Sequence, residues 1–112
     1  MLIRESETTR VENGSNCVVW EYDFPKQAFS FATASIQGRY PERGMVMNKE
    51  CEELYYVLSG SGTVHSQKGD FPLMKGDAYH FEKAEVFWVE GKELKLALLN
   101  IPKWTPEQHV QA

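Results

Sequence analysis

Residues 52–62 read Glu-Glu-Leu-Tyr-Tyr-Val-Leu-Ser-Gly-Ser-Gly, and residues 74–79 read Met-Lys-Gly-Asp-Ala-Tyr. The first stretch carries aromatic and β-branched residues, which favour a strand, and it ends in a Gly-Ser-Gly turn signal. The second stretch carries a Lys-Gly-Asp turn signal before another strand-forming run. Two strands bounded by such turns are typical of a small all-β domain.

Turn signals recur at fairly regular intervals on both sides of this stretch, at 13–14, 38–41, 60–62, 68–70, 75–77 and 90–92. The runs between them are rich in β-branched and aromatic residues, so each is expected to be a strand. These runs are 18–22, 29–37, 53–58, 63–66, 77–81, 85–90 and 94–101. Short strands separated by Gly, Asn and Asp turns predict a sandwich or a barrel.

The two quoted stretches resemble the two sequence motifs of the cupin superfamily, and the resemblance spans roughly Gly38 to Gly91. It implies an all-β fold, a cupin-type antiparallel jelly-roll barrel with little or no helix. Residues 1–112 are then expected to form a single cupin domain. Its core barrel would cover about 29–101, with N-terminal strands in 1–28 and a C-terminal tail at 102–112.

In that family, three histidines and a glutamate usually hold a divalent metal. Glu53 matches the glutamate, because six residues separate it from Gly60. The histidine positions fall on residues without an imidazole: Val46 and Asn48 or, with a shorter spacer, Met47 and Lys49, and then Phe87. A transition metal needs several N, O or S donors in a defined geometry. The sequence therefore predicts a metal-free cupin with no cofactor.

Glu53 is expected to point into the barrel, because the motif fixes its register. A buried carboxylate without a metal must find hydrogen-bond donors or take up a proton. Asn48 and Tyr55, which is two residues along and thus on the same strand face, are the candidate partners. Phe87 and Arg39 complete the predicted ligand-binding set. Arg39 would clamp a carboxylate or phosphate at the barrel mouth, or else form a salt bridge on the rim.

His65 and His80 lie on the strands after the two motifs. A rebuilt metal site of Glu53, His65 and His80 can be drawn, but a lone strand histidine is more often packed or solvated. A metal-free isomerase or epimerase would need a histidine base and a tyrosine acid. Here that catalytic pair would come from His65, His80, Tyr55 and Tyr79.

The C-terminal tail contains the one clear helix signal. Thr105 can cap a helix, Pro106 fits its first position, and Gln108 completes a capping box, so one short turn is expected. Trp104 is expected to dock on the sheet and His109 to lie in solvent. The alternative is a flap over the barrel mouth that brings His109 near the pocket.

Composition limits the possible partners. Twelve Lys and Arg face sixteen Asp and Glu, which gives a net charge of -4; the basic residues are scattered, so nucleic acid is not expected. No stretch approaches the roughly 20 apolar residues of a membrane-spanning helix, and the N-terminus lacks the apolar run of a signal peptide. Cys17 and Cys51 form no Cys-x-x-Cys pair. A cytoplasmic protein with free thiols is therefore predicted.

The predicted function is the binding of a small polar molecule, a sugar or a small organic acid, in the barrel. The alternative is a metal-independent sugar or sugar-acid isomerase or epimerase that uses acid–base residues. A homodimer is also expected, because cupins commonly pair through edge strands and an aromatic-rich chain of this size would gain burial from it.

Overall fold

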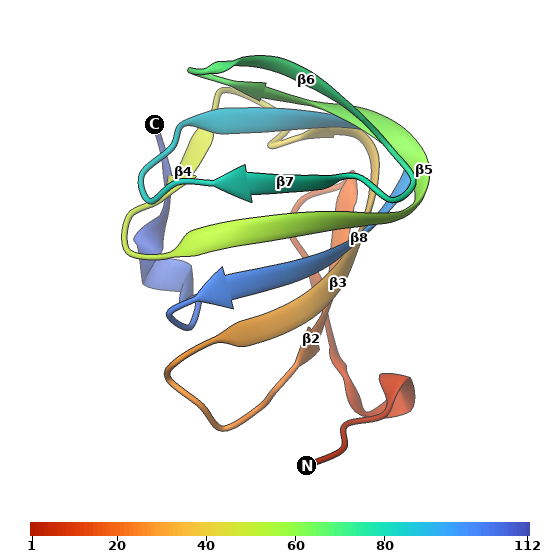
Figure 1. Cartoon of the computed structure of the whole chain (residues 1–112), viewed down its shortest axis with the longest axis vertical. Coiled ribbons are helices and arrows are strands. Elements are labelled where there is room, and N and C mark those ends of the chain that lie inside the picture. The colour runs from red at the N-terminus through yellow and green to blue at the C-terminus, as the bar shows by residue number, and fades with distance from the viewer.

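The computed structural model describes all residues 1–112 as a curled, wholly antiparallel sheet (Figure 1). Its strands are β1 (Thr9–Glu12), β2 (Cys17–Tyr22), β3 (Ser30–Tyr40), β4 (Val46–Asn48), β5 (Glu52–Ser66), β6 (Gly69–Met74), β7 (Ala78–Phe81), β8 (Phe87–Ile101) and β9 (His109–Gln111). Two 3-10 turns, η1 (Glu5–Glu7) and η2 (Pro106–Gln108), are the only helical segments. The predicted all-β barrel is confirmed. None of the helical segments has the length and apolarity that a membrane crossing requires.

Strand β8 is the centre of the sheet. It pairs along almost its whole length with β3 on one side and with β5 on the other. Beyond β3 the sheet continues into β2 and β1, and beyond β5 it continues into β6 and β7. Strand β4 pairs with the start of β8 and with the C-terminal strand β9. The end of the chain therefore lies against its middle.

The glycines at 60–62 and 90–92 do not end strands, so the turns predicted there are wrong. They lie inside β5 and β8, which are each continuous over 15 residues. A Cβ at Gly60 would overlap the backbone carbonyl of Glu93, and one at Gly91 would overlap that of Ile36. The absence of side chains at these positions lets the long strands bend and pass close to one another.

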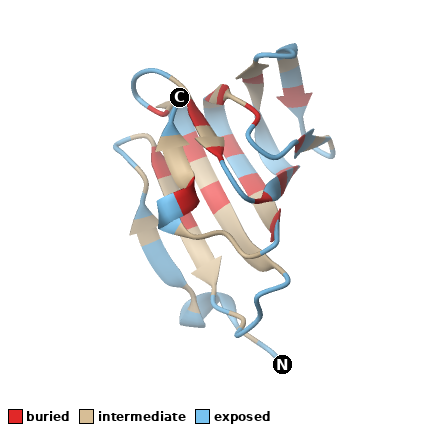
Figure 2. Ribbon diagram, turned by 90° about the vertical axis from the view of Figure 1, so that its left-hand side faces the viewer, coloured by how far each residue is buried: buried red, intermediate tan, exposed pale blue.

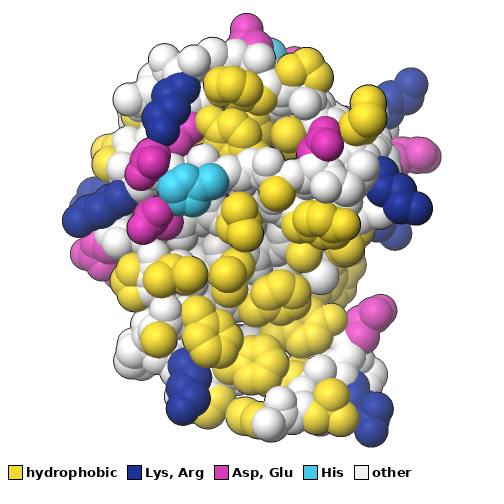
Figure 3. Space-filling view, viewed as in Figure 1, with side chains coloured by type: hydrophobic (Ala, Val, Ile, Leu, Met, Phe, Trp, Pro, Cys, Tyr) yellow, Lys and Arg dark blue, Asp and Glu magenta, His cyan; other side chains and the backbone are white.

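Buried and exposed residues alternate along the first half of β5, where residues 53, 55 and 57 face the interior and residues 54, 56 and 58 face outward (Figure 2). The core on the inner side is a cluster of 14 buried residues that includes Phe81, Phe87 and Leu96. The outer side also carries apolar residues: hydrophobic side chains gather over β5, β8 and β3 in Figure 3.

The predicted C-terminal turn is present as η2, but the predicted capping is wrong. Thr105 makes no side-chain cap hydrogen bond. The side chain of Gln108 is buried instead, and its Nε2 donates to the carbonyl of Lys103 and to Oγ1 of Thr105 at 3.3 and 3.4 Å. Gln108 thus fastens the tail internally and to the backbone of Glu50, rather than capping a helix.

Candidate functional site

A cavity opens on the inner side of the curled sheet, between β2, β3, β5, β8 and the C-terminal segment. Its volume is about 130 Å³. Most of its wall is aliphatic or aromatic. The polar residues that reach it are Asn13, Glu21, Asp23, Ser30, Tyr40, Glu53, Tyr55, Asn100, Lys103 and His109.

Glu53 and Asn100 form a buried polar pair in the cavity wall. They are opposite each other in the register of β5 and β8, and only 8% and 6% of their surfaces are exposed. Nδ2 of Asn100 donates to Oε2 of Glu53 at 2.9 Å. Burial raises the pKa of Glu53 to about 7, although the hydrogen bond from Asn100 lowers it. Near neutral pH, this carboxyl group can therefore both donate and accept a proton.

A second polar group in the wall joins Tyr40, His109, Asn48 and Trp104. The hydroxyl of Tyr40 lies 2.7 Å from Nε2 of His109, and Nδ1 of His109 lies 2.7 Å from Oδ1 of Asn48. The same Oδ1 accepts a hydrogen bond from Nε1 of Trp104 at 3.0 Å. Four side chains from β3, β4 and the C-terminal segment are thereby linked in one chain.

This hydrogen-bond chain assigns the tautomer of His109. Because Oδ1 of Asn48 can only accept, the proton of the imidazole is on Nδ1, and Nε2 accepts from the hydroxyl of Tyr40. Burial lowers the pKa of His109, and it raises the pKa of Tyr40. At neutral pH the pair is therefore a neutral base next to a neutral phenol.

The pairing of β4 with β9 places His109 in the wall. Asn48 is opposite His109 in that register, and Lys49 N donates to the carbonyl of Gln108 at 2.9 Å. The expectation that His109 lies in solvent is wrong for this reason, whereas Trp104 docks as expected. Of the alternatives weighed from the sequence, the flap that brings His109 to the pocket agrees with this placement. In the sequence, only the apolar tail residues Trp104 and Val110 indicate that the tail packs against the barrel.

Of the predicted ligand-binding residues, Glu53, Tyr55 and Phe87 line the cavity, and Asn48 lies behind it as the partner of His109. The Tyr55 side chain is buried between Phe81 and the cavity, and its hydroxyl forms no hydrogen bond within the protein. A ligand could therefore use that hydroxyl. Cys17 also lines the cavity, where burial raises the pKa of its thiol to about 12, so it is not a thiolate nucleophile.

Arg39 and His65 lie on the outside of the barrel, away from the cavity. Arg39 sits over the ring of Trp88 at 3.8 Å, and the ring of His65 stacks on Trp88 at 3.9 Å. The two ring nitrogens of His65 contact Asp70 and Glu90 at 2.6 and 2.7 Å. The strand register turns these side chains outward, so neither Arg39 as a clamp nor His65 as a base fits the cavity.

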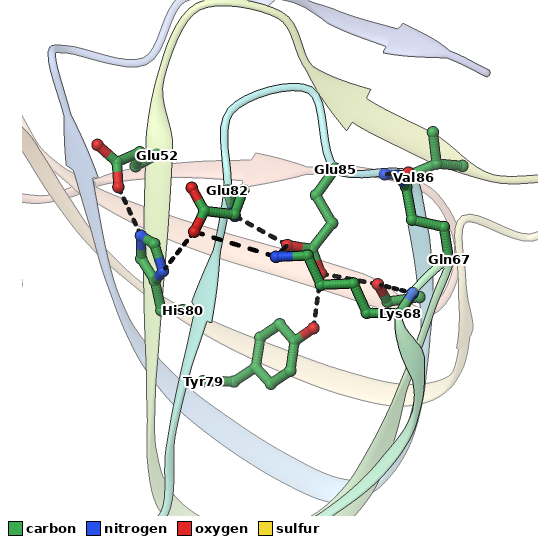
Figure 4. Close-up of polar contacts among 9 residues, drawn as sticks. Glu52, Gln67, Lys68, Tyr79, His80, Glu82, Glu85 and Val86 are labelled. Atoms are coloured by element: carbon green, nitrogen blue, oxygen red, sulfur yellow. Dashed lines mark hydrogen bonds and ion pairs between the residues drawn. The ribbon is translucent and has the colours of Figure 1, made fainter.

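His80 and Tyr79 are also engaged elsewhere (Figure 4). His80 is exposed, with Nε2 at 2.6 Å from Glu52 and Nδ1 at 3.8 Å from Glu82. The hydroxyl of Tyr79 donates to the buried Glu85 at 2.6 Å, outside the residues that line the cavity. The catalytic pair drawn from the sequence therefore reduces to Tyr55 as the one candidate with access to the cavity.

The residues at the family's metal-ligand positions do not fit a transition metal. Oδ1 of Asn48 already accepts two hydrogen bonds, and Phe87 offers no donor atom, which leaves Glu53 as the one available ligand. His65 and His80 contact separate carboxylates on the outer surface and do not join Glu53. His109 has both ring nitrogens engaged. One carboxylate does not satisfy the coordination of such an ion.

No known family profile matches the sequence, and no curated protein matches it. Solved structures match it by fold. Pac13 of Streptomyces, a nucleoside dehydratase solved with uridine, has a TM-score of 0.89 and 15% identity, over 100% of this chain and 89% of that one. Ectoine synthase from P. lautus has a TM-score of 0.80 and 15% identity, over 100% and 89%. An RmlC-like cupin from Shewanella frigidimarina has a TM-score of 0.74 and 14% identity, over 89% and 88%.

Proposed function

This chain has the cupin fold, and we propose that it binds a small polar ring compound, such as a sugar or a nucleoside, in its barrel cavity. The observation that carries the proposal is the buried Glu53–Asn100 pair in an otherwise mostly apolar wall. Oε1 of Glu53 and the hydroxyl of Tyr55 have no hydrogen-bond partner in the protein. Polar groups that are placed in an apolar cavity without partners are what a specific ligand site needs.

The composition of the wall favours a ligand with a flat or apolar face and several hydroxyls. Aromatic side chains in the cavity wall, including Tyr22, Phe31 and Trp104, can pack on a ring. Glu21 and Lys103, which also line the cavity, can hydrogen-bond hydroxyl groups. The fold likeness to a nucleoside dehydratase solved with uridine supports a compound of this size and chemistry.

A second candidate function is metal-independent acid–base catalysis on the bound compound. It is favoured by two groups in the same wall: Glu53, whose pKa is about 7, and the neutral Tyr40–His109 pair. An isomerisation, epimerisation or dehydration requires a base that removes a proton from carbon and an acid that protonates oxygen. Glu53, or His109 acting through the hydroxyl of Tyr40, would take up the proton, and Tyr55 would act as the acid, in place of the outward-facing His65 and His80.

The binding proposal is tested by thermal denaturation with uridine, glucuronate and glucose as probes. A ligand that binds only the folded protein raises the melting temperature by mass action. We expect a saturable rise with at least one probe, and we expect Glu53→Gln and Tyr55→Phe to weaken it. Lys83→Gln, an exposed residue remote from the cavity, is the control that should retain it. No rise with any probe would overturn the proposal.

The catalytic candidate is tested by proton exchange in heavy water. If a base in the cavity removes a carbon-bound proton, a bound probe will exchange that proton for deuterium, which NMR of the probe detects. We expect His109→Gln or Glu53→Gln to abolish exchange and His80→Gln to leave it intact. A probe that binds but never exchanges would leave the protein a binder without this chemistry.

The cytoplasmic location and the homodimer remain predictions. The cavity lies within one copy of the chain, so ligand binding as proposed here needs no second subunit.

A further inference from the structure

The ionisable residues that line the cavity are mostly acidic. Glu21, Asp23 and Glu53 carry carboxyl groups, whereas Lys103 is the one lysine or arginine among the lining residues. His109 adds no positive charge at neutral pH, because burial lowers its pKa. Even when Glu53 is protonated, two carboxylates therefore face one ammonium group, and this imbalance bears on the charge of the ligand.

Two of the carboxylates are neighbours where β2 ends. Glu21 is the second-last residue of β2, and Asp23 directly follows the strand. Both line the cavity, and they are two residues apart, a spacing that directs both side chains to the same side of an extended chain. Glu21 is half-buried and Asp23 is exposed. The pair can therefore be reached from solvent and also borders the cavity.

Neither carboxylate has a basic partner within the protein. The ion pairs of lysine and arginine in this chain are made by Arg10 and Lys68 instead. One oxygen of Asp23 accepts a hydrogen bond from Oγ1 of Thr9 at 2.7 Å, whereas the side chain of Glu21 accepts none. Burial raises the pKa of Glu21, the charge of Asp23 raises it further, and Lys103 lowers it by less. The repulsion between the two carboxylates is thus only partly offset.

A second polar point faces the same cavity from β5. Glu53 and Tyr55 are 8% and 5% exposed, and Oε1 of Glu53 and the hydroxyl of Tyr55 have no partner in the protein. Both atoms remain accessible, since no fully buried polar side-chain atom of the chain lacks a partner. These groups need a ligand to complete their hydrogen bonds.

The strand register gives the separation of the two polar points. Glu21 is opposite Ala32, Ala32 is opposite Leu98, and Leu98 is opposite Tyr55. Three strand spacings of about 4.8 Å correspond to roughly 14 Å along the sheet, and the curl of the sheet shortens the direct path (Figure 1). The surface between them is apolar. A compound that reaches both points has a polar group at each end and a ring or other apolar part in the middle.

We propose that the ligand of this cavity carries an ammonium group, which binds between the carboxylates of Glu21 and Asp23 while a neutral polar group binds at Glu53 and Tyr55. The inference rests on the proposed binding of a ring compound and narrows that compound to an amino-substituted sugar or nucleoside. An ammonium group has three N–H donors and a positive charge, so it can donate to both carboxylates and offset their repulsion. An acidic ligand would instead meet like charges.

The experiment compares compounds that differ in one substituent. At C6 of one hexose, 6-amino-6-deoxyglucose, glucose and glucuronate carry an amine, a hydroxyl and a carboxylate. At C5′ of one nucleoside, 5′-amino-5′-deoxyuridine, uridine and uridine-5′-carboxylate carry the same three groups. Dissociation constants are measured by titration calorimetry at pH 7 and low salt. In whichever set binds, we expect the amine to bind about tenfold more tightly than the hydroxyl compound and the carboxylate to bind most weakly. Added salt should reduce the difference.

Single charge removals locate the preference. Glu21→Gln should make the amine and the hydroxyl compound bind equally well, because the amide still accepts a hydrogen bond but carries no charge. Glu107→Gln is the matched control: it removes one carboxylate from an exposed position outside the cavity and should keep the preference. Lys103→Gln should tighten binding of the amine, because it removes the one positive charge beside the two carboxylates.

The outcomes separate this inference from the binding proposal. A carboxylate compound that binds as tightly as its amine counterpart would overturn the inference and leave ligand binding in place. So would an amine preference that Glu21→Gln does not reduce, or amine binding that Lys103→Gln weakens, since Lys103 would then hold an acidic group of the ligand. If none of the six compounds binds, the binding proposal fails and the inference fails with it.

Discussion

Glu53 lies where burial and an amide hydrogen bond act on its pKa in opposite directions, and burial prevails. Its pKa rises from 4.5 to about 7 on folding. Between these pH values, the folded protein holds a proton that the unfolded chain has lost, so the free energy of unfolding falls as the pH rises. The rise from 4.5 to about 7 corresponds to roughly 3 kcal/mol at full effect.

Glu53→Gln should remove this pH dependence, because the amide keeps the shape of the neutral acid and does not titrate. The measurement is urea denaturation at pH 5 and pH 8. Glu107→Gln, an exposed residue on the tail, is the control and should behave as the wild type does. If the free energy of unfolding falls by the same amount from pH 5 to pH 8 in the wild type and in Glu53→Gln, the burial argument is contradicted.

The pKa values of His65 and His109 should be shifted in opposite directions from the usual value of a histidine, and NMR of their ring protons can measure both. Burial lowers the pKa of His65, but its hydrogen bonds and charge interactions with Asp70 and Glu90 raise it more, so it should lie above 6.5. Burial lowers the pKa of His109, which should lie below 6.5. The stability that protonated His65 adds should be lost as the pH rises through its raised pKa. A His109 pKa above that of His65 would contradict the assigned environments.

The sequence could predict the inward position of Glu53, because the motif spacing from Gly60 fixes its register. It could not predict His109 in the cavity, because that depends on a three-residue pairing between β4 and β9, far apart along the chain. The sequence analysis predicts Arg39 at the mouth of the barrel, as a clamp or as a salt-bridge partner on the rim. In the structure, the register of β3 and β8 turns Arg39 toward Trp88 on the outside. A one-residue difference in register decides on which face such a side chain lies.

At the scale of elements, Gly60 should be among the least replaceable residues of β5. Its φ is +75°, and a Cβ there would overlap the carbonyl of Glu93. Gly60→Ala should cost more than about 3 kcal/mol in denaturant unfolding. Gly76→Ala is the matched control: its φ is +91° but nothing lies within 4 Å of the added Cβ, so only a conformational cost of about 1 to 2 kcal/mol is expected. Equal costs would exclude the close approach as the cause.

The stability with which the C-terminal strand β9 is held against β4 should depend on the side chain of Gln108. Its side chain donates to Lys103 and Thr105 and accepts from the backbone of Glu50 at 3.3 Å. Gln108→Leu leaves these partly buried polar groups without partners and should cost about 2 kcal/mol. Glu107→Ala, its exposed neighbour, should cost little. If Gln108→Leu loses both stability and ligand binding, the result fits the role of β9 in holding His109 in the cavity wall. An unchanged free energy of unfolding would contradict the predicted role of Gln108.

The sequence predicts the number of strands poorly. Glycine is a typical turn signal, so the glycines at 60–62 and at 91 predict two strands in place of each of β5 and β8. The distinction between a turn and a close strand crossing depends on what lies opposite the glycine, which local sequence does not contain. The sequence patterns predict no strand at β4, β6 or β9. The three-residue pairings of β4 and β9 have no periodic pattern.

At the scale of the whole molecule, one curled sheet has an inner face that lines the cavity and an outer face toward solvent. The alternation along β5 directs Glu53 and Tyr55 toward the cavity and Leu54 and Tyr56 toward solvent. Substitutions on the outer face should therefore leave the proposed ligand binding intact.

The most direct test of the central claim is a titration of uridine into the isotope-labelled protein, followed by NMR of backbone amides. If the cavity is the binding site, saturable shifts should appear at Tyr40, Glu53, Asn100 and His109, and Glu53→Gln should weaken them. Shifts confined to the outer face of β5 and β8 would contradict the account. So would saturable binding that Ala34→Leu, which adds a larger side chain to the cavity wall, does not reduce.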